Sequence, residues 1–463
     1  MTGARKRRIP DGVFLKNVIR IALPISLQQL ITVGVNLMDT VMLSEMGDAQ
    51  LSASALGGQF INLFQIFCMG IGMGASVLTS RYWGMKELTP LRKTVTLMLR
   101  VVAAFAGAFT LFTVISPRVV MLLYTGDEEI ISYGIQYLTW LIPTYACIGF
   151  SLTCTIILRS VEQVKLPLFS SIAAFFINIF CNWVFIFGHF GAPRMEIAGA
   201  ALGTLIARLF ELCFICGYFF VKDRKIGYRI RMITMKCRDL VGEYFRVCIP
   251  VIISDGLLAL GNNAVAMVMG RIGKNFVAAN SVTTIVQQLS TVLTSGVSHA
   301  SCIITGHTMG EGDNEKAQRQ GYTFLLIGLV LGVFAAAVIL LLKEPIIAYY
   351  KVEEETRVIA RSLMDAISFI VVFQAVNSIL TKGVLRAGGD TRFLMAGDIL
   401  FLWIASIPLG ILAAFVFHWD SFWIYTMLKI DQIIKCVWCY QRLRSRKWMK
   451  KIYAADSERR QEK

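Results

Sequence analysis

The residues best suited to chemistry lie on one face of the first long apolar segment. Gln29, Thr32, Asn36 and Asp39 are three or four positions apart, so they share one side of an α-helix with the adjacent Gln28. Hydrogen bonds between packed helices are enough to explain the neutral residues of this stripe, but they explain a single ionisable Asp poorly. A carboxylate in the middle of a membrane costs about 2.5–3.5 kcal/mol. The stripe must therefore face other helices or water, and we predict that Asp39 has a functional role.

Three further side chains offer oxygen atoms that suit the same chemistry. Asn178 and Asn182 are one helical turn apart, and Thr204 lies in the next apolar segment, beside the glycine-rich stretch 199–203. Amide and hydroxyl oxygens beside a carboxylate are ligands for a hard cation, and they also hydrogen-bond a protonated Asp39. A packing role for the two asparagines is equally consistent with the sequence.

The second half of the chain has its own polar residues within apolar segments. Asp255 and Asn262 are seven residues apart and share one helix face, and Asp255 is the strongest charged candidate in this half. Asp431 precedes Lys435 by four residues, a spacing that predicts an internal ion pair. The residues that we expect to line a substrate cavity are Asn36, Asp255, Asn262, Gln287, Gln374 and Asp398.

Such residues need a scaffold that holds polar groups inside a membrane, and the composition indicates one. Hydrophobic residues make up 56% of the 463 positions and charged residues 16%, against roughly 45–50% and 25% in soluble domains. Apolar runs of about 20 residues are long enough to span a bilayer. Twelve such runs lie near 18–43, 53–79, 94–116, 131–158, 168–189, 198–221, 247–270, 279–305, 321–342, 359–384, 393–417 and 421–440. We predict an all-α polytopic membrane protein with twelve transmembrane helices.

Basic residues give the expected orientation. They gather in residues 1–17, in the stretch 222–246 and in the tail 441–463, whereas loops on the other side carry the acidic runs 127–129 and 353–355. The positive-inside rule then places both termini in the cytoplasm. The formal net charge of +16 is explained by this topology and by anionic lipid at the inner leaflet. We therefore expect membrane lipid, and no nucleic acid, as a partner.

The stretch 222–246 separates two lobes of six expected helices, 18–221 and 247–440, which repeat one another. Residues that recur at an offset of 226 are Arg20 with Arg246, Pro24 with Pro250, Asn36 with Asn262, Gly47 with Gly273, Gly70 with Gly296, and Gly84 with Gly310. The buried charges break this symmetry, because Val265 occupies the position equivalent to Asp39. A duplicated membrane scaffold with unequal buried charges is typical of a transporter.

The sequence favours a secondary transporter over an enzyme. The nucleotide-binding pattern G-x-x-x-x-G-K-[ST] does not occur, so this chain cannot hydrolyse a nucleotide by the P-loop route. If it pumps, the energy comes from an ion gradient or from a separate subunit. Cys213 with Cys216 and Cys436 with Cys439 have C-x-x-C spacing, but both pairs lie in apolar segments without a second ligand pair, as buried thiols do. We expect no cofactor beyond the coupling ion.

At these residues the chain resembles the multidrug and toxin extrusion (MATE) family of cation-coupled exporters. The resemblance covers nearly the whole length. The stretches that carry it are 36–40 after Pro24, 83–87 with its repeat 309–313, 178–187, and 385–391.

The resemblance implies an exporter in which Asp39 binds the coupling cation, H⁺ or Na⁺, with Asn178, Asn182 and Thr204 lining the same site. It implies export of amphiphilic, mostly cationic drugs or toxins in exchange for that inward cation. We interpret Pro24 as the hinge that lets the first helix bend when the cation binds.

The chain departs from the pattern of some relatives at two places, and other transporter classes remain as alternatives. Asn182 stands where some relatives carry a carboxylate and others an Asn. Leu258 and Gln374 stand where some relatives carry acidic residues, so a sodium site in the second lobe is not implied. A major-facilitator-type carrier also has two six-helix halves, but the loop after the second span lacks that group's acidic, arginine-rich motif. A lipid-linked oligosaccharide flippase often has extra spans and a basic cavity, whereas the mid-span charges here are mostly acidic. We expect a monomer in the cell's inner (plasma) membrane.

Overall fold

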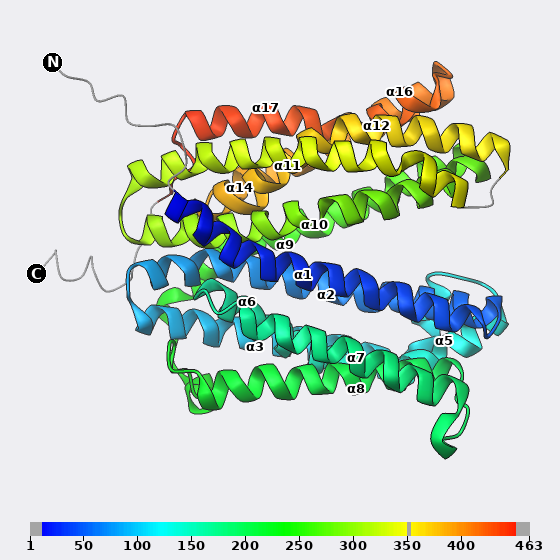
Figure 1. The fold of residues 1–463 in the computed structure, drawn as a ribbon. Helices are drawn as coiled ribbons and strands as arrows, with labels where there is room; N and C mark the ends of the chain where they lie inside the picture. Colours follow the sequence, from blue (N-terminus) through cyan, green and yellow to red (C-terminus); the bar gives the residue numbers. More distant parts are fainter. Residues whose placement is uncertain (1–11, 350–352, 451–463) are drawn as a thin grey trace, which may run out of the picture. The chain divides into compact units, whose positions relative to one another are not determined.

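Helices form all the regular secondary structure in the part of the chain that the computed structural model describes, residues 12–349 and 353–450. Every one of the twelve expected ranges is helical (Figure 1). The first six correspond to α1 (Gly12–Ser44), α2 (Asp48–Gly84), α3 (Leu88–Ile115), the pair α5 (Glu128–Leu141) and α6 (Thr144–Ser160), α7 (Lys165–Phe187), and α8 (Ile197–Gly217). Short elements between them are α4 (Pro117–Leu122), η1 (His189–Gly191), η2 (Tyr218–Lys222) and η3 (Ile230–Thr234).

The remaining six expected spans are longer or more irregular. They correspond to α9 (Arg238–Ile272), α10 (Lys274–Gly310), α11 (Asn314–Tyr349), the run of α12 (Glu354–Ser378), η4 (Ile379–Val384) and α13 (Leu385–Ala387), the run of α14 (Thr391–Asp398), η5 (Ile399–Ser406), α15 (Ile407–Ile411) and η6 (Leu412–Val416), and the pair α16 (Ser421–Leu428) and α17 (Asp431–Arg444). The segments η4, η5 and η6 are π-helical, a geometry that often occurs at functional sites.

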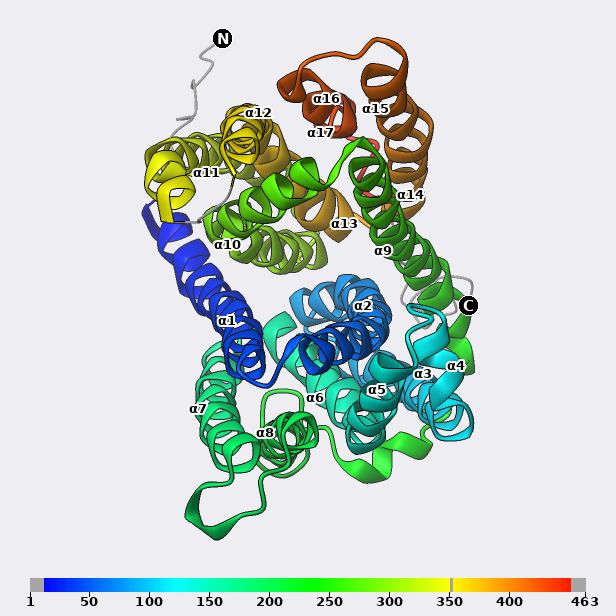
Figure 2. The same ribbon diagram turned by 90° about the vertical axis from the view of Figure 1, so that its right-hand side faces the viewer.

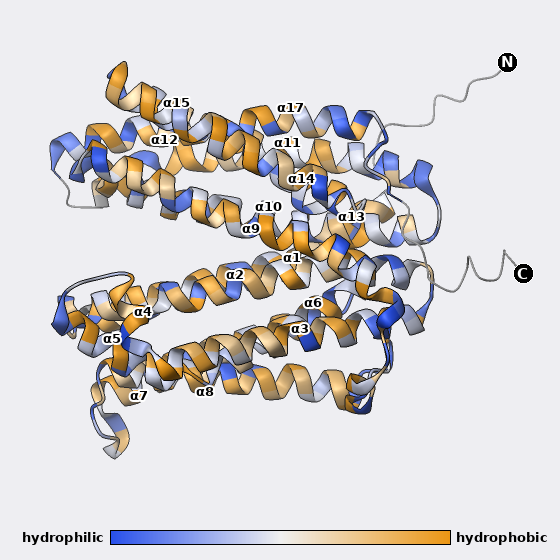
Figure 3. Ribbon diagram, turned by 180° about the vertical axis from the view of Figure 1, so that it is seen from behind, coloured by the Kyte–Doolittle hydropathy of each residue, from blue (hydrophilic) through white to orange (hydrophobic). Residues whose placement is uncertain are grey.

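The helices have the dimensions and polarity of membrane spans. Within the described residues, nine are long and apolar enough to cross a bilayer, and α5 with α6 forms a tenth span that bends by 52°. Pro143 lies at this bend, where its missing N–H interrupts the helix. Figure 3 shows apolar residues along the helices and polar residues concentrated at their ends.

The described residues divide into two compact units, and the divisions fall inside α1 and α9. One unit consists of residues 27–255, and the other of residues 12–26 together with 256–349 and 353–450. Both divisions lie shortly after a proline inside the helix, Pro24 in α1 and Pro250 in α9. The expected lobes 18–221 and 247–440 divide the chain in the inter-lobe loop instead, and they stay a prediction.

In the unit 27–255, α2 is the central helix. It packs against α3, α5 and α6, and α7 packs along α8. Phe60, Phe64, Phe109 and Tyr145 form an aromatic cluster whose ring centroids lie 5.2–6.4 Å apart. The approach of α8 to α7 requires glycine at position 199, because a Cβ there would lie 2.5 Å from the backbone of Phe185. This close approach brings the polar residues of α7 and α8 together.

In the other unit, α10, α11 and α12 pack against one another and lie side by side in Figure 2. The buried side chains of α12 include Leu363, Ile367 and Ile370, which belong to one apolar core. α12 also packs against α16 and α17. These contacts hold the buried polar residues of α12 and α17 in fixed positions.

Candidate functional site

Asp39 of α1 forms a direct hydrogen bond with α7. The Asn182 Nδ2 amide donates to Asp39 Oδ1 at 2.6 Å. The Asn182 side chain is fully buried and Asp39 is half-buried. The two residues are 143 positions apart in the sequence. Packing of α1 against α7 brings a mid-span carboxylate and a mid-span amide together, as expected for polar groups that face the helix bundle.

Two more predicted residues extend this contact into a chain of polar groups. The same Asn182 Nδ2 lies 3.4 Å from Asn178 Oδ1, and Asn178 Nδ2 lies 3.4 Å from Thr204 Oγ1 of α8. Both distances are at the long end for hydrogen bonds. All four side chains predicted for the cation site are therefore linked across α1, α7 and α8. Their role in cation binding stays a prediction.

Gly203 of α8 makes room for this arrangement. A Cβ at position 203 would lie 2.2 Å from Asn182 Oδ1 and 3.0 Å from the Asn182 backbone nitrogen. Asn182 Oδ1 is buried and has no hydrogen-bond partner among the described residues. A buried carbonyl oxygen without a partner carries a desolvation cost of about 1–3 kcal/mol. This oxygen is a free acceptor beside the carboxylate.

Other titratable groups act on Asp39 at longer range. The charge of Arg208 and the phenol of Tyr137 both lie within electrostatic range of the Asp39 carboxyl group. Arg208 Nη1 also pairs with Glu211 Oε2 at 3.0 Å, as their spacing of three residues on one helix allows. The site is therefore a single carboxylate surrounded by neutral polar groups, with a neutralised pair one or two turns further along α8.

The composition of the site limits its chemistry. Among the described residues, no three His, Cys, Asp or Glu side chains lie close enough together to hold a metal ion. The Asp39 cluster has one carboxylate, two amides and one hydroxyl. These groups suit a monovalent cation or a proton, because multivalent hard cations usually bind several carboxylates.

The polar stripe of α1 also has a structural member that sequence spacing did not separate from the rest. Gln28 Nε2 donates to the Pro167 carbonyl oxygen at 3.0 Å and to Ser171 Oγ at 2.8 Å. Its Oε1 accepts from the buried Arg159 guanidinium of α6. Gln28 thus fastens α1 to α6 and α7, one turn after Pro24.

The residues predicted to line a substrate cavity are found in different surroundings. Asn36 and Asn262 are exposed. Asp255 is half-buried, and its Oδ2 lies 3.8 Å from the position of a Cβ on Gly70 of α2. Gln287 Nε2 of α10 donates to Gln374 Oε1 of α12 at 2.7 Å. A cavity formed by all six residues stays a prediction.

Asp398 belongs to a buried charge cluster that the sequence showed only in part. Lys435 Nζ of α17 lies 2.9 Å from Asp398 Oδ1 and 3.2 Å from Asp431 Oδ2. The second distance confirms the predicted pair of Asp431 and Lys435. The pairing with Asp398 was missed, because 37 residues separate the two partners and no periodicity relates two different helices. Ser406 Oγ donates to Asp431 Oδ1 at 3.1 Å.

With this geometry established, comparison with known proteins gives the family. The model of the MatE family matches residues 24–184 and again residues 250–416. The chain belongs to the MatE family. The two matches begin at Pro24 and Pro250, the same prolines that the internal repeat relates, so both lobes of this MatE chain carry the family pattern.

Curated relatives of this MatE chain cover nearly its full length. It is 26% identical to "Probable multidrug resistance protein NorM" of Mesorhizobium japonicum over 453 residues, which covers 90% of this chain and 92% of the relative. It is 25% identical to the protein of the same name from Thermotoga maritima, covering 88% and 86%. The expected membership of the MATE family is confirmed.

Solved structures share the MatE fold of this chain. A MATE protein in a bent conformation aligns with a TM-score of 0.83 at 18% identity, covering 94% of this chain and 96% of that one. A transporter of the MOP superfamily from Pyrococcus furiosus, described as having a binding pocket of reverse polarity, aligns with a TM-score of 0.82 at 19% identity, covering 93% and 96%. These matches confirm the all-α, multi-pass, two-lobed fold class.

Proposed function

We propose that this MatE-family chain is a secondary active antiporter that exports amphiphilic, mostly cationic drugs or toxins in exchange for inward H⁺ or Na⁺. The observation that carries the proposal is the chain of polar contacts from Asp39 through Asn182 and Asn178 to Thr204. An ionisable group inside a membrane bundle is expensive to bury, and it marks an ion or substrate pathway. The names of the relatives, multidrug resistance proteins, support drugs as the substrates.

The Asn182 amide can form a hydrogen bond with Asp39 in both its ionised and its protonated state. The ionised carboxylate accepts a hydrogen bond from Asn182 Nδ2, which is the observed contact. A protonated Asp39 becomes a donor, and the unpartnered Asn182 Oδ1 is an acceptor on the same side chain. In this proposal, rotation of the amide exchanges the two hydrogen bonds. A Na⁺ ion would instead draw the oxygens of Asn178, Asn182 and Thr204 toward the carboxylate.

Helix α1 connects this exchange to a conformational change. Pro24 removes one backbone hydrogen bond inside α1, whereas Gln28 is held to α6 and α7 by its side chain. We propose that Pro24 is the hinge about which α1 bends when Asp39 is neutralised. One charge moving inward down 100 mV releases about 2.3 kcal/mol, equivalent to about a fortyfold concentration ratio.

The drug is proposed to bind along the polar residues of both halves. Asn36, Asp255, Asn262 and the hydrogen-bonded pair of Gln287 and Gln374 would provide its polar contacts. Asp398 is the least favourable of the predicted cavity residues, because Lys435 already neutralises it. We propose that the protein works as a monomer in the inner membrane, with both termini in the cytoplasm.

The test compares Asp39→Asn with Glu45→Gln, an exposed acidic residue just after α1. Purified variants are reconstituted in liposomes, and ethidium efflux is driven either by a Na⁺ gradient at constant pH or by a pH gradient without Na⁺. Asp39→Asn should abolish efflux under both gradients, whereas Glu45→Gln should transport normally. The gradient that drives the native protein identifies the coupling ion. Undiminished gradient-driven efflux from Asp39→Asn would refute the proposal, and counterflow of a lipid-linked sugar in place of ethidium would favour the flippase alternative.

A further inference from the structure

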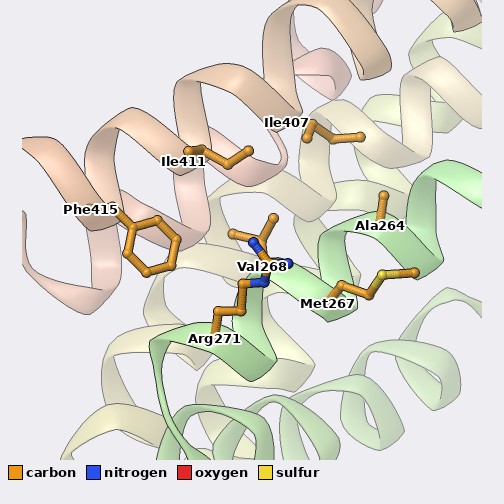
Figure 4. A pocket seen from close by; sticks show the side chains of 7 residues that line it. All are labelled: Ala264, Met267, Val268, Arg271, Ile407, Ile411 and Phe415. Atoms are coloured by element: carbon orange, nitrogen blue, oxygen red, sulfur yellow. The ribbon is translucent and has the colours of Figure 1, made fainter.

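A groove of about 370 Å³ lies between α9 and the run of α15 and η6 (Figure 4). The groove is lined by Ala264, Met267, Val268, Arg271, Ile407, Ile411 and Phe415. The four residues from α9 recur at helical spacing and form one face, and the other three are each four positions apart on the facing helix. Figure 4 shows these two rows facing each other.

The groove opens toward the lipid and extends to the membrane surface. Met267, Ile411 and Phe415 are 67%, 40% and 42% exposed, and all lie in apolar spans, whose exposed apolar surface contacts acyl chains. Arg271 is the last residue but one of α9. Trp419 and Trp423, which follow η6, are also largely exposed. Tryptophan gathers at the headgroup level, so this end of the groove lies near the polar headgroups.

The charge of Arg271 indicates which kind of ligand the groove binds. Arg271 is exposed and has no ion pair or hydrogen bond with any described residue. The volume of the groove corresponds to roughly twelve groups the size of a water molecule or a methylene, at about 30 Å³ each. That is the scale of one acyl chain. A guanidinium at the headgroup level attracts phosphate and repels the cationic drugs proposed as substrates.

We propose that this groove binds an anionic glycerophospholipid, with one acyl chain between α9 and α15 and the headgroup phosphate on Arg271. The acyl chain adds little to the choice between lipids, because it moves from one apolar environment, the bilayer, to another, the groove. The Arg271 contact must therefore provide the selectivity, and one basic residue near the surface corresponds to a roughly fivefold preference for anionic over zwitterionic lipid.

The internal repeat supports a specific site over a general property of the fold. The residues 226 positions before Ala264, Met267, Val268 and Arg271 are Met38, Val41, Met42 and Glu45. The apolar positions are kept, but the position of Arg271 holds an acidic residue. This equivalent face of α1 would repel an anionic headgroup, so the proposed lipid site belongs to the second half of the chain alone.

The experiment measures the lipid retained by the purified full-length protein in native mass spectrometry, with phosphatidylglycerol and phosphatidylcholine of identical chains added in equal amounts. The native protein should retain phosphatidylglycerol about fivefold over phosphatidylcholine. Arg271→Gln should abolish that preference. Ala264→Phe, which adds a bulky side chain to the groove lining, should lower retention of both lipids. Lys274→Gln, an exposed basic residue at the start of α10, is the matched control and should behave as the native protein does.

Several results would overturn the proposal. Equal retention of the two lipids by the native protein would do so, as would an equal effect of Arg271→Gln and Lys274→Gln, which would indicate general surface charge. Unchanged retention in Ala264→Phe would show that no chain enters the groove. If ethidium displaces bound lipid from the native protein and from Arg271→Gln alike, the groove is a drug entrance. Arg271 is exposed, so its substitution leaves the fold intact even if Ala264→Phe does not fold.

Discussion

Replacing Gly203 with alanine should change the cation dependence of transport without removing any polar group of the Asp39 site. The added Cβ would lie 2.2 Å from Asn182 Oδ1, and the amide would have to move by at least about 0.8 Å to reach even a tight contact of 3.0 Å. The Asn182 backbone nitrogen would lie only 3.0 Å from the same Cβ, so the backbone of α7 is also in tight contact with the new methyl group. Movement toward Asp39 is blocked by the hydrogen bond of 2.6 Å. The amide must swing aside and lose that bond.

The expected size of the effect follows from the lost contact. A hydrogen bond to a charged group contributes about 1.5–3 kcal/mol, which corresponds to roughly a 10- to 150-fold change in the equilibrium between cation-free and cation-loaded Asp39. We expect ethidium efflux in liposomes to need a correspondingly altered cation concentration for half-maximal rate. Gly217→Ala, at the end of the same helix with no atom within 4 Å of its Cβ, should leave that concentration unchanged.

A double-mutant cycle separates this mechanism from general damage to α8. In an Asn182→Ala background there is no amide for the Cβ to displace, so Gly203→Ala should add almost nothing to the effect of Asn182→Ala. Size-exclusion chromatography in detergent confirms that each variant is folded. Native cation dependence in Gly203→Ala, or fully additive effects of the two substitutions, would refute this role of Gly203.

Two further predictions concern packing and buried charge. Lys435→Met leaves the buried carboxylates of Asp398 and Asp431 without their common cation, so it should lower the free energy of unfolding by about 3–5 kcal/mol. Asp398→Asn should lower it less, because Lys435 keeps its second partner, Asp431. Melting temperatures in detergent test this order, and a lower melting temperature for Asp398→Asn than for Lys435→Met would contradict the proposed charge cluster. Gly74→Ala places a Cβ 2.8 Å from the α9 backbone, whereas Gly58→Ala meets nothing within 4 Å. Gly74→Ala should therefore lower the melting temperature by several degrees while Gly58→Ala leaves it unchanged, and equal melting temperatures would show that α2 and α9 are not closely packed.

The composition of the candidate site could be predicted from sequence, but its connections could not. Asp39, Asn178, Asn182 and Thr204 were identified because each is polar inside an apolar run, and such groups must face the bundle. Gly203 was noted only as part of a glycine-rich stretch. Its role depends on how closely α8 approaches α7, and no repeating pattern in the sequence reports the distance between two helices. Gln28 shows the opposite case, since its spacing matches Asp39 but its contacts with Arg159 and Pro167 are structural.

The sequence by itself indicated the positions of the membrane helices, the internal repeat and a carboxylate in the middle of the first span. These features depend on hydrophobic runs and residue spacing, which the chain carries locally. Only the tertiary structure decided which polar side chains meet: Asn182 with Asp39, Gln287 with Gln374, and Lys435 with Asp398. Pairs on different helices are brought together by helix packing, where glycine positions and side-chain volumes set the separation to within an ångström.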